Sequence, residues 1–305
     1  MLLTIVVSAG FYLYCDSLAL TQEKPITSAA QGEVLGEVTE KARGADAPAS
    51  GIKQKAAGPL AFNDISAKAF AVFENTTKTE LFGNNEHQKL PIASLTKLMT
   101  ALLAYENLEP YDYLNISAAD RLKVNPKLDL EPEENIQIIN LLEASLVCSA
   151  NDAARALARA TEEKNGVDFV TLMNLRAKEL GMEETSFSNP LGFDSWYNYS
   201  TVSDLVKLTN FTQNLAAFKN LGKKTSVSFV SKENRNYSCL ATNKLVGKNV
   251  EIEAVKTGST PEAKGAMIAK VSREGKTVLV ILLESENREK DLLSLSNLAF
   301  RAFDW

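Results

Sequence analysis

Three short motifs contain the residues of this chain that could carry out nucleophilic chemistry. In the first, Ser94 and Lys97 lie three residues apart within an apolar run, PIASLTKLMTALLA. Residues at this spacing occupy neighbouring turns of one helix face, so the lysine amine can reach the hydroxyl. Burial disfavours the charged form of a lysine, and a neutral amine can accept the serine proton. The pair predicts a serine nucleophile with a lysine base. The alternative is that Ser94 caps a helix on which Lys97 faces solvent.

The other two motifs lie further along the chain. Ser149 and Asn151 stand between two apolar runs, where the hydroxyl could relay protons and the amide could hold a substrate carbonyl. Both residue types also cap helices, which is the alternative interpretation. Lys256, Thr257 and Gly258 end another apolar stretch. They would offer a cation and a hydroxyl to a carboxylate, while glycine lets a peptide backbone approach closely. The alternative here is a strand end followed by a turn.

The chain offers few residues for other kinds of catalysis. It has one histidine, His87, and three cysteines, Cys15, Cys148 and Cys239, which do not have the spacing of metal ligands. We therefore expect no metal, no cofactor and a general base other than histidine. So few cysteines, odd in number, predict no disulfide framework, and Cys148 and Cys239 are interpreted as small buried hydrophobic residues.

Size and charge restrict the class of protein. The 305 residues are 45% hydrophobic and 23% charged, which is enough for a real core in one large or two small domains. The formal net charge is −5. Such a chain lacks the excess of positive charge that binding to a phosphate backbone uses, so we expect no nucleic-acid partner.

The composition divides the chain into three parts. Residues 1–20 are largely apolar and contain Asp16 as their one charged residue, which predicts a signal peptide or an N-terminal membrane anchor. Residues 21–58 contain no aromatic residue and little apolar periodicity, which is typical of a flexible linker. Residues 59–305 form the expected globular domain.

Strand and helix patterns within the globular part predict its architecture. Strands are expected at both ends of this part, and helices between them, with a last helix at 289–303. The expected strands are 69–73, 79–82, 225–230, 237–241, 252–256, 266–271 and 277–283, and the expected inner helices are 94–106, 135–148, 152–161, 167–180 and 202–212. This order predicts an α/β (α+β) fold, in which an antiparallel sheet made from both chain ends packs on a helical subdomain.

The order and spacing of the three motifs resemble a known family. The motifs lie 55 and then 107 residues apart, in the order found in penicillin-binding proteins and class A β-lactamases. The segments SANDAARALA, LGMEETSFSNPLGF, YSTVSDLVKLT and ATNKLVG are also similar to those of low-molecular-mass penicillin-binding proteins, the D-alanyl-D-alanine carboxypeptidases of serine peptidase family S11. The resemblance covers nearly the whole globular part and implies a β-lactamase/transpeptidase-like fold.

The resemblance also implies a reaction and a role for each catalytic residue. The terminal D-Ala-D-Ala of a peptidoglycan stem peptide would acylate Ser94, with Lys97 as the base. Ser149 and Lys256 would carry the proton to the leaving D-alanine, and Asn151 would bind the substrate amide. β-Lactam antibiotics would be covalent inhibitors, and the protein would act as a monomer outside the cytoplasm.

The same resemblance assigns the remaining binding residues. The backbone N–H groups of Ser94 and Ser259 would form the oxyanion hole beside Gly258. Thr257 would bind the terminal carboxylate together with Arg288, which is placed only by its distance after the third motif and could equally be a surface arginine.

The sequence departs from the family pattern in places. Ala254 and Val255 replace a common Gly-Ile pair, and Ser259 stands where His or Tyr is common, which leaves substrate preference open. The sequence ends at Trp305, where many relatives continue into an all-β domain and an amphipathic helix, so we expect any membrane attachment at the N-terminus.

Three other functions remain open. A D,D-endopeptidase would cut peptidoglycan cross-links with the same residues, and a non-catalytic penicillin-binding sensor would be expected to lack one of the motifs. A β-lactamase would need a glutamate to activate water, for which Glu183 and Glu184 are the candidates.

Overall fold

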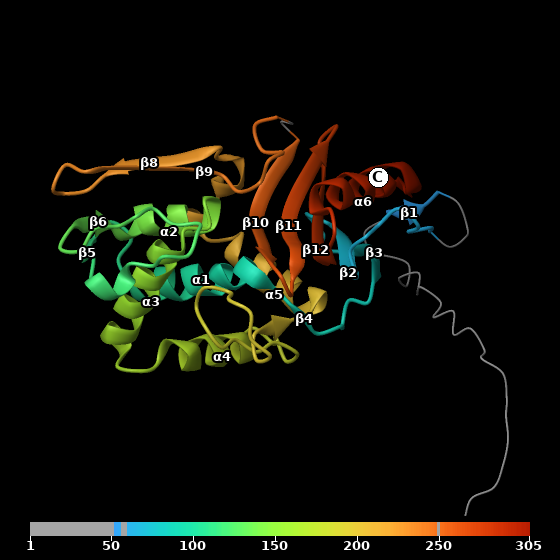
Figure 1. Cartoon of the computed structure of the whole chain (residues 1–305). Helices are drawn as coiled ribbons and strands as arrows, with labels where there is room; N and C mark the ends of the chain where they lie inside the picture. Colours follow the sequence, from blue (N-terminus) through green and yellow to red (C-terminus); the bar gives the residue numbers. More distant parts are fainter. Residues whose placement is uncertain (1–51, 56–59, 249–250) are drawn as a thin grey trace, which may run out of the picture. The chain divides into compact units, whose positions relative to one another are not determined.

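The computed structural model describes residues 52–55, 60–248 and 251–305, all of which belong to one compact unit. Its centre is a five-stranded antiparallel sheet with the strand order β10-β11-β12-β2-β3 (Figure 1). The strands are β2 (Ala69–Glu74), β3 (Glu80–Asn84), β10 (Ile252–Thr260), β11 (Lys264–Arg273) and β12 (Lys276–Ser285). Strand β2 pairs directly with β12, so the sheet joins both ends of the globular part. The predicted fold class is confirmed.

Alternating side chains along each strand supply two separate cores. On β2, Phe70 and Val72 enter the core that lies under α6 (Arg288–Ala302), together with Leu292 and Leu295 of that helix. The alternate residues, such as Ala71, enter the larger core on the opposite face. Because successive side chains of a strand point to opposite faces, all six residues of β2 are buried. The sheet is therefore a layer between helices (Figure 1).

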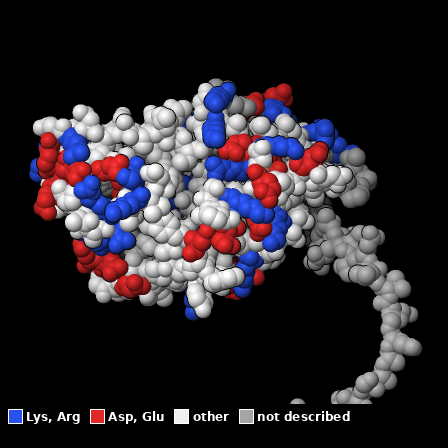
Figure 2. Space-filling view, viewed as in Figure 1, with Lys and Arg blue, Asp and Glu red and all other residues white. Residues whose placement is uncertain are grey.

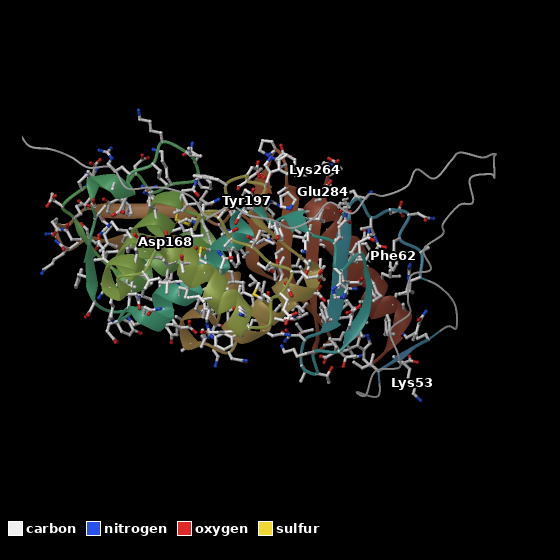
Figure 3. All side chains as sticks on the ribbon, turned by 90° about the horizontal axis from the view of Figure 1, so that it is seen from below. Lys53, Phe62, Asp168, Tyr197, Lys264 and Glu284 are labelled. Atoms are coloured by element: carbon white, nitrogen blue, oxygen red, sulfur yellow. A yellow bond between two sulfur atoms is a disulfide. The ribbon has the colours of Figure 1, made fainter. Side chains whose placement is uncertain are left out.

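A helical subdomain covers the other face of the sheet. Its helices are α1 (Lys97–Asn107), α2 (Ile138–Val147), α3 (Asn151–Asn165), α4 (Phe169–Glu179) and α5 (Val202–Thr212). Helix α1 contacts each of the other four, and its residues 97–104 are all buried. The side chain of Asp168 caps α4 by accepting a hydrogen bond from the N–H of Thr171. In Figure 3, the label Asp168 lies in this subdomain and the label Phe62 lies on the side of the sheet. Helix α1, which begins at Lys97 of the first motif, is thus the centre of the helical subdomain.

The remaining elements are short, and several of them differ from the predicted bounds. They are β1 (Lys53–Gln54), β4 (Leu90–Pro91), η1 (Ala93–Thr96), β5 (Tyr113–Asn115), η2 (Ala118–Asp120), β6 (Asn135–Gln137), β7 (Tyr199–Ser200), η3 (Ala216–Phe218), η4 (Leu221–Lys223), β8 (Ser226–Val230), β9 (Asn236–Leu240) and β13 (Phe303–Asp304). Strand β1 pairs with β13, so residues that we expected in the linker are paired with the end of the chain. Strands β8 and β9 form a hairpin of their own that lies along α2, outside the main sheet (Figure 1).

That hairpin also corrects the prediction for the cysteines. Cys148, at the end of α2, forms a disulfide with Cys239 of β9, with the two Cα atoms 5.9 Å apart. The interpretation of both as free buried hydrophobic residues was wrong. The two cysteines are 91 residues apart in sequence, and only the packing of the hairpin on α2 brings them together.

Other expectations concern residues outside the described ranges. The predicted signal peptide or anchor at 1–20, Cys15 and most of the expected linker belong to this group. In the part of the chain that the structure describes, no helix is both long enough and apolar enough to cross a membrane. Figure 2 shows acidic and basic side chains intermixed over one face of the molecule.

Candidate active site

The first motif forms a serine–lysine pair at the start of α1. Ser94 lies in the short helix η1 and Lys97 is the first residue of α1. The Lys97 Nζ donates to Ser94 Oγ at 2.9 Å and to the carbonyl of Leu191 at 2.7 Å. The side chain of Lys97 is buried, and burial lowers its pKa from 10.5 to about 7. At neutral pH, a large share of Lys97 is therefore a free amine within hydrogen-bond reach of the hydroxyl.

The backbone around Ser94 is held in an unusual conformation by close neighbours. Ala93 has φ +47°, a left-handed value that costs free energy for a residue with a Cβ. Gly192 and Gly258 pack against this turn so closely that a Cβ would lie 1.9 Å from the Ala93 carbonyl oxygen at position 192 and 2.9 Å from the Ser94 nitrogen at position 258. Glycine is thus required at both positions to hold the turn that presents Ser94.

The second motif lies at the junction of α2 and α3. Ser149 has φ +60°, and its buried Oγ has no hydrogen-bond partner within the described ranges. The side-chain amide of Asn151 donates to the carbonyl of Val124 at 3.1 Å, and its backbone N–H donates to Pro126. An unpaired buried hydroxyl is costly unless something else pairs with it. Ser149 is therefore free to bond a reacting group, whereas Asn151 is already held by the loop before α2.

The third motif lies on β10, which is an edge strand that pairs only with β11 among the described residues. Lys256 is fully buried, and its Nζ donates to the carbonyl of Thr257 at 2.8 Å. Burial and the neighbouring positive charges of Lys97 and Arg288 lower the pKa of Lys256. Thr257 Oγ1 lies 2.6 Å from the hydroxyl of Thr242, and Ser259 is exposed beyond the motif. The edge strand leaves backbone groups available to an extended peptide.

Arg288 reaches the same strand from the start of α6. Its Nη1 donates to the carbonyl of Gly258 at 2.7 Å, and its Nε donates to Glu289. Gly265 of β11 lies beside Arg288, but the close contact of a Cβ at this position would be with the Ser285 carbonyl oxygen, at 2.8 Å. The arginine is therefore fixed beside the third motif and is not an isolated surface residue.

These contacts bring most of the predicted residues together. Hydrogen bonds join Ser94 to Lys97 and Arg288 to Gly258, and Gly258 packs against the backbone nitrogen of Ser94. Charge interactions connect Lys256 to Lys97 and Arg288. Ser149 and Asn151 connect to β10 less directly, since the N–H of Thr242 donates to Val147 at 3.1 Å and Thr242 bonds Thr257. Sequence reasoning assigned no role to Leu191, Gly192 and Thr242, although these loop residues lie within the family-like segments LGMEETSFSNPLGF and ATNKLVG.

His87 lies elsewhere and is paired with an acid. Its side chain is three-quarters exposed, and its Nδ1 lies 2.9 Å from the Glu184 carboxylate. Glu183 is exposed. Within the described ranges, His, Cys, Asp and Glu residues do not gather in a group that could hold a metal ion.

The site combines a buried lysine beside a serine, an unpaired serine hydroxyl and a lysine on an edge strand. This arrangement is typical of serine acyl-transfer enzymes of the penicillin-recognising class. The D-alanyl-D-alanine carboxypeptidase family, peptidase family S11, matches residues 53–287, and the chain belongs to it. This confirms the family that the motifs predicted.

Several relatives are similar over most of the described chain. D-alanyl-D-alanine carboxypeptidase DacF of Bacillus subtilis is 28% identical over 255 residues, which cover 78% of this chain and 63% of the relative. The chain thus spans less than two thirds of that relative. A D-alanyl-D-alanine endopeptidase of Haemophilus influenzae is 35% identical over 201 residues, which cover 65% of this chain and 68% of the relative.

Solved structures agree with the fold. The Streptomyces K15 DD-transpeptidase superposes with a TM-score of 0.72 at 27% identity and covers 79% of this chain and 99% of its own. Penicillin-binding protein D2 of Listeria monocytogenes, solved with cefotaxime bound, gives a TM-score of 0.66 at 30% identity. The match covers 80% of this chain and 100% of the Listeria chain.

Proposed function

We propose that this chain is a serine D,D-carboxypeptidase that removes the terminal D-alanine from peptidoglycan stem pentapeptides. The observation that carries the proposal is the 2.9 Å contact between Lys97 Nζ and Ser94 Oγ, with a lysine pKa of about 7. Lys97 takes the proton of Ser94 as the serine oxygen attacks the carbonyl of the penultimate D-alanine. The acyl-enzyme forms as the C–N bond breaks, and water later releases the shortened peptide.

The leaving group needs a proton from the enzyme. Ser149 carries an unpaired buried hydroxyl, and Lys256 lies close enough to Lys97 for their charges to interact. In the proposed reaction the proton passes through Ser149 and Lys256 to the amine of the departing D-alanine. The backbone N–H groups of Ser94 and Ser259 bind the oxyanion, and losing one such donor costs about 3–4 kcal/mol of transition-state stabilisation.

The amine, hydroxyl and guanidinium groups beside β10 favour a substrate that ends in a free carboxylate. Lys256, Thr257 and Arg288 are held there by the bonds described above. Thr257 and Arg288 bind the terminal carboxylate, while Asn151 binds an amide of the substrate. β-Lactams carry a carboxylate and an acylating carbonyl, so we propose that they acylate Ser94.

The disulfide supports a site of action outside the cytoplasm. Disulfides persist in oxidising compartments and are rare in the cytosol. The bond between Cys148 and Cys239 fits an exported protein. We further propose that the protein acts at the cell wall as a monomer, with any membrane attachment through residues 1–20.

A D,D-endopeptidase is the second candidate, because the relative with 35% identity carries that name. The β-lactamase alternative has less support, because Lys97 bonds the Leu191 carbonyl while Glu184 pairs with His87. All three motifs are intact, which argues against a non-catalytic sensor.

Two substrates distinguish these functions. The protein is incubated with a D-Ala-D-Ala pentapeptide and, separately, with a cross-linked muropeptide dimer. Release of free D-alanine from the first supports the carboxypeptidase. Cleavage of the dimer alone would replace it with the endopeptidase, and rapid turnover of penicillin with neither reaction would favour the β-lactamase.

A further inference from the structure

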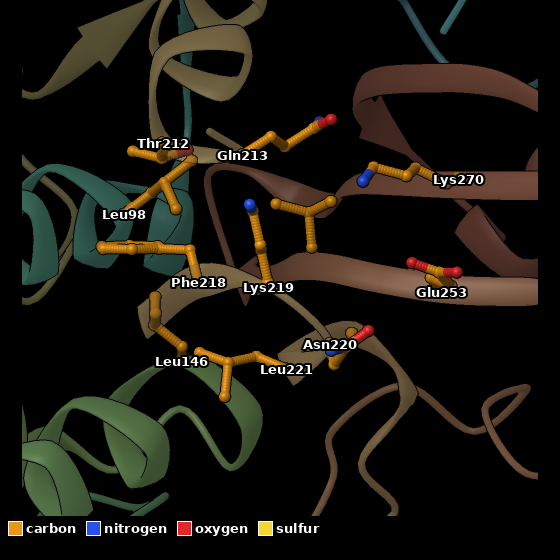
Figure 4. A pocket seen from close by; sticks show the side chains of 12 residues that line it. Leu98, Leu146, Thr212, Gln213, Phe218, Lys219, Asn220, Leu221, Glu253 and Lys270 are labelled. Carbon is orange, nitrogen blue, oxygen red and sulfur yellow. The ribbon is translucent and has the colours of Figure 1, made fainter. Parts of the chain in front are cut away.

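A cavity lies behind the strand that carries Lys256 (Figure 4). Its volume is about 190 Å³, and Leu98, Phe218 and Val255 contribute to its apolar lining. A protein cavity of about 150 Å³ with apolar walls can hold benzene, so this space suits a compact ring or a short alkyl chain. It is formed where the segment that follows α5 folds over β10, away from the substrate-binding residues.

The cavity wall contains the sequence neighbours of both catalytic lysines. Val255 directly precedes Lys256, and Leu98 directly follows Lys97. The pairing of β10 with β11 shifts register between Ala254 and Lys256, so Val255 is the extra residue of a β-bulge. Bulges re-aim the side chains beside them. A molecule that packs on Val255 therefore contacts the point that sets the direction of Lys256.

Two nitrogen groups at this cavity make no hydrogen bond within the described residues: the amide nitrogen of Gln213 and the amine of Lys270. Lys270 of β11 is half-buried, and burial lowers the pKa of its amine. Its cross-strand neighbour Glu253 attracts this amine, but the Glu253 carboxylate is itself held in an ion pair with Lys223 at 3.0 Å. The buried side-chain nitrogen of Gln213 has no hydrogen-bond partner among the described residues. Figure 4 shows the polar ends of Gln213 and Lys270 directed toward one another across the cavity.

The charges around the cavity favour an anion. Lys219 and Lys270 line it, and the single lining carboxylate, Glu253, is already paired with Lys223. A carboxylate has two oxygens, which match one ammonium and one amide donor. A strongly hydrated anion such as phosphate would have to lose its water against the apolar lining, which is costly.

We propose that this cavity is a regulatory site for a small carboxylate with a compact apolar body. The carboxylate binds between Lys270 and Gln213, and the apolar body packs on Phe218 and Val255. Occupancy then changes the rate at which Ser94 is acylated, because the ligand contacts the bulge next to Lys256.

Binding is tested on the full chain with benzoate as the probe in a calorimetric titration. We expect saturable binding of benzoate, and at least tenfold weaker binding of benzyl alcohol and of inorganic phosphate. Lys270→Met should weaken benzoate binding at least tenfold, Lys270→Arg should restore it, and Lys290→Met, which changes an exposed lysine on α6, should leave it unchanged. The absence of saturable binding, or equal binding by Lys270→Met, would overturn the site.

Two measurements separate this cavity from the active site. Protein that has been acylated with penicillin should still bind benzoate, and loss of binding there would mean that benzoate occupies the substrate site. Benzoate should change the acylation rate by fluorescent penicillin at least twofold, with the same midpoint as binding and no effect on Lys270→Met. Binding that leaves the rate unchanged would overturn the regulatory role. The titration itself does not depend on any enzymatic activity of the chain.

Discussion

Lys97 and Lys256 are both buried, and the pKa of Lys256 is lowered first by this burial and then by the positive charge of Lys97. The two amines therefore do not readily carry charge together, and a proton that one gains is disfavoured on the other. In a reaction that takes a proton from Ser94 and returns one to a leaving amine, such a pair favours passing the proton on. This relationship underlies the first two predictions.

The acylation rate should rise with pH. Lys97 acts as a base only when neutral, and its pKa is about 7, so raising the pH through 7 increases the active form. The neutral fraction grows about tenfold between pH 6 and pH 8. Stopped-flow acylation with a penicillin whose own charge is constant over this range measures the profile. A flat profile between pH 6 and 8 would contradict the lysine base.

Replacing Lys97 with methionine should abolish acylation while the fold survives. Methionine fills similar space without a charge, so the buried position remains packed. General-base catalysis contributes about 10²–10⁴-fold to rate, and we expect a loss of at least that size. Labelled penicillin measures the adduct, and circular dichroism checks the fold. Acylation of the variant at the wild-type rate would show that another group takes the proton.

Sequence spacing was enough to predict the chemistry that lies on single elements. Ser94 and Lys97 are three residues apart, so helical geometry alone placed the amine near the hydroxyl, although Ser94 lies on the short helix η1 just before α1. Short apolar and β-branched runs likewise identified β2 and β12, whose pairing forms the sheet from both chain ends. Such local patterns do not depend on the rest of the fold.

Contacts that depend on loops could not be predicted in this way. The carbonyl of Leu191 bonds Lys97 across 94 residues, and the disulfide joins Cys148 to Cys239 across 91. Each depends on where a loop or hairpin packs, which local propensity does not determine. The hairpin β8–β9 also has the strand pattern of the main sheet, so its separate position became evident only from packing.

Gly192→Ala should impair acylation more than stability alone explains. Its φ is +84°, and an added Cβ would lie 1.9 Å from the Ala93 carbonyl oxygen, so the turn that presents Ser94 must shift. We expect at least a tenfold slower acylation and a lower melting temperature. Gly275→Ala is the matched control, because φ there is +76° with no atom within 4 Å of the new Cβ. It should lose about 1 kcal/mol of stability and keep the acylation rate. Equal rates in both variants would refute the role of Gly192.

His87→Ala should leave acylation within twofold of wild type. The histidine is largely exposed and bonds Glu184, and no hydrogen bond joins it to Ser94 among the described contacts. Exposed pairs of this kind contribute little to stability, so the fold should also be unaffected. Kinetics with fluorescent penicillin checks the rate. A loss of a hundredfold or more in a folded variant would restore a histidine base.

Removal of the disulfide should weaken both stability and acylation. The bond closes a loop of about 90 residues, for which chain entropy predicts about 4–5 kcal/mol of stabilisation, and it lies one residue before Ser149, whose φ is +60°. Reduction of the native protein should lower its urea midpoint and slow acylation several-fold below the melting range, because Ser149 loses its link to β9. A double variant with Cys148→Ala and Cys239→Val should show the same losses and no further response to reductant. If reduction lowers stability while acylation is unchanged, the bond supports the fold and does not position Ser149.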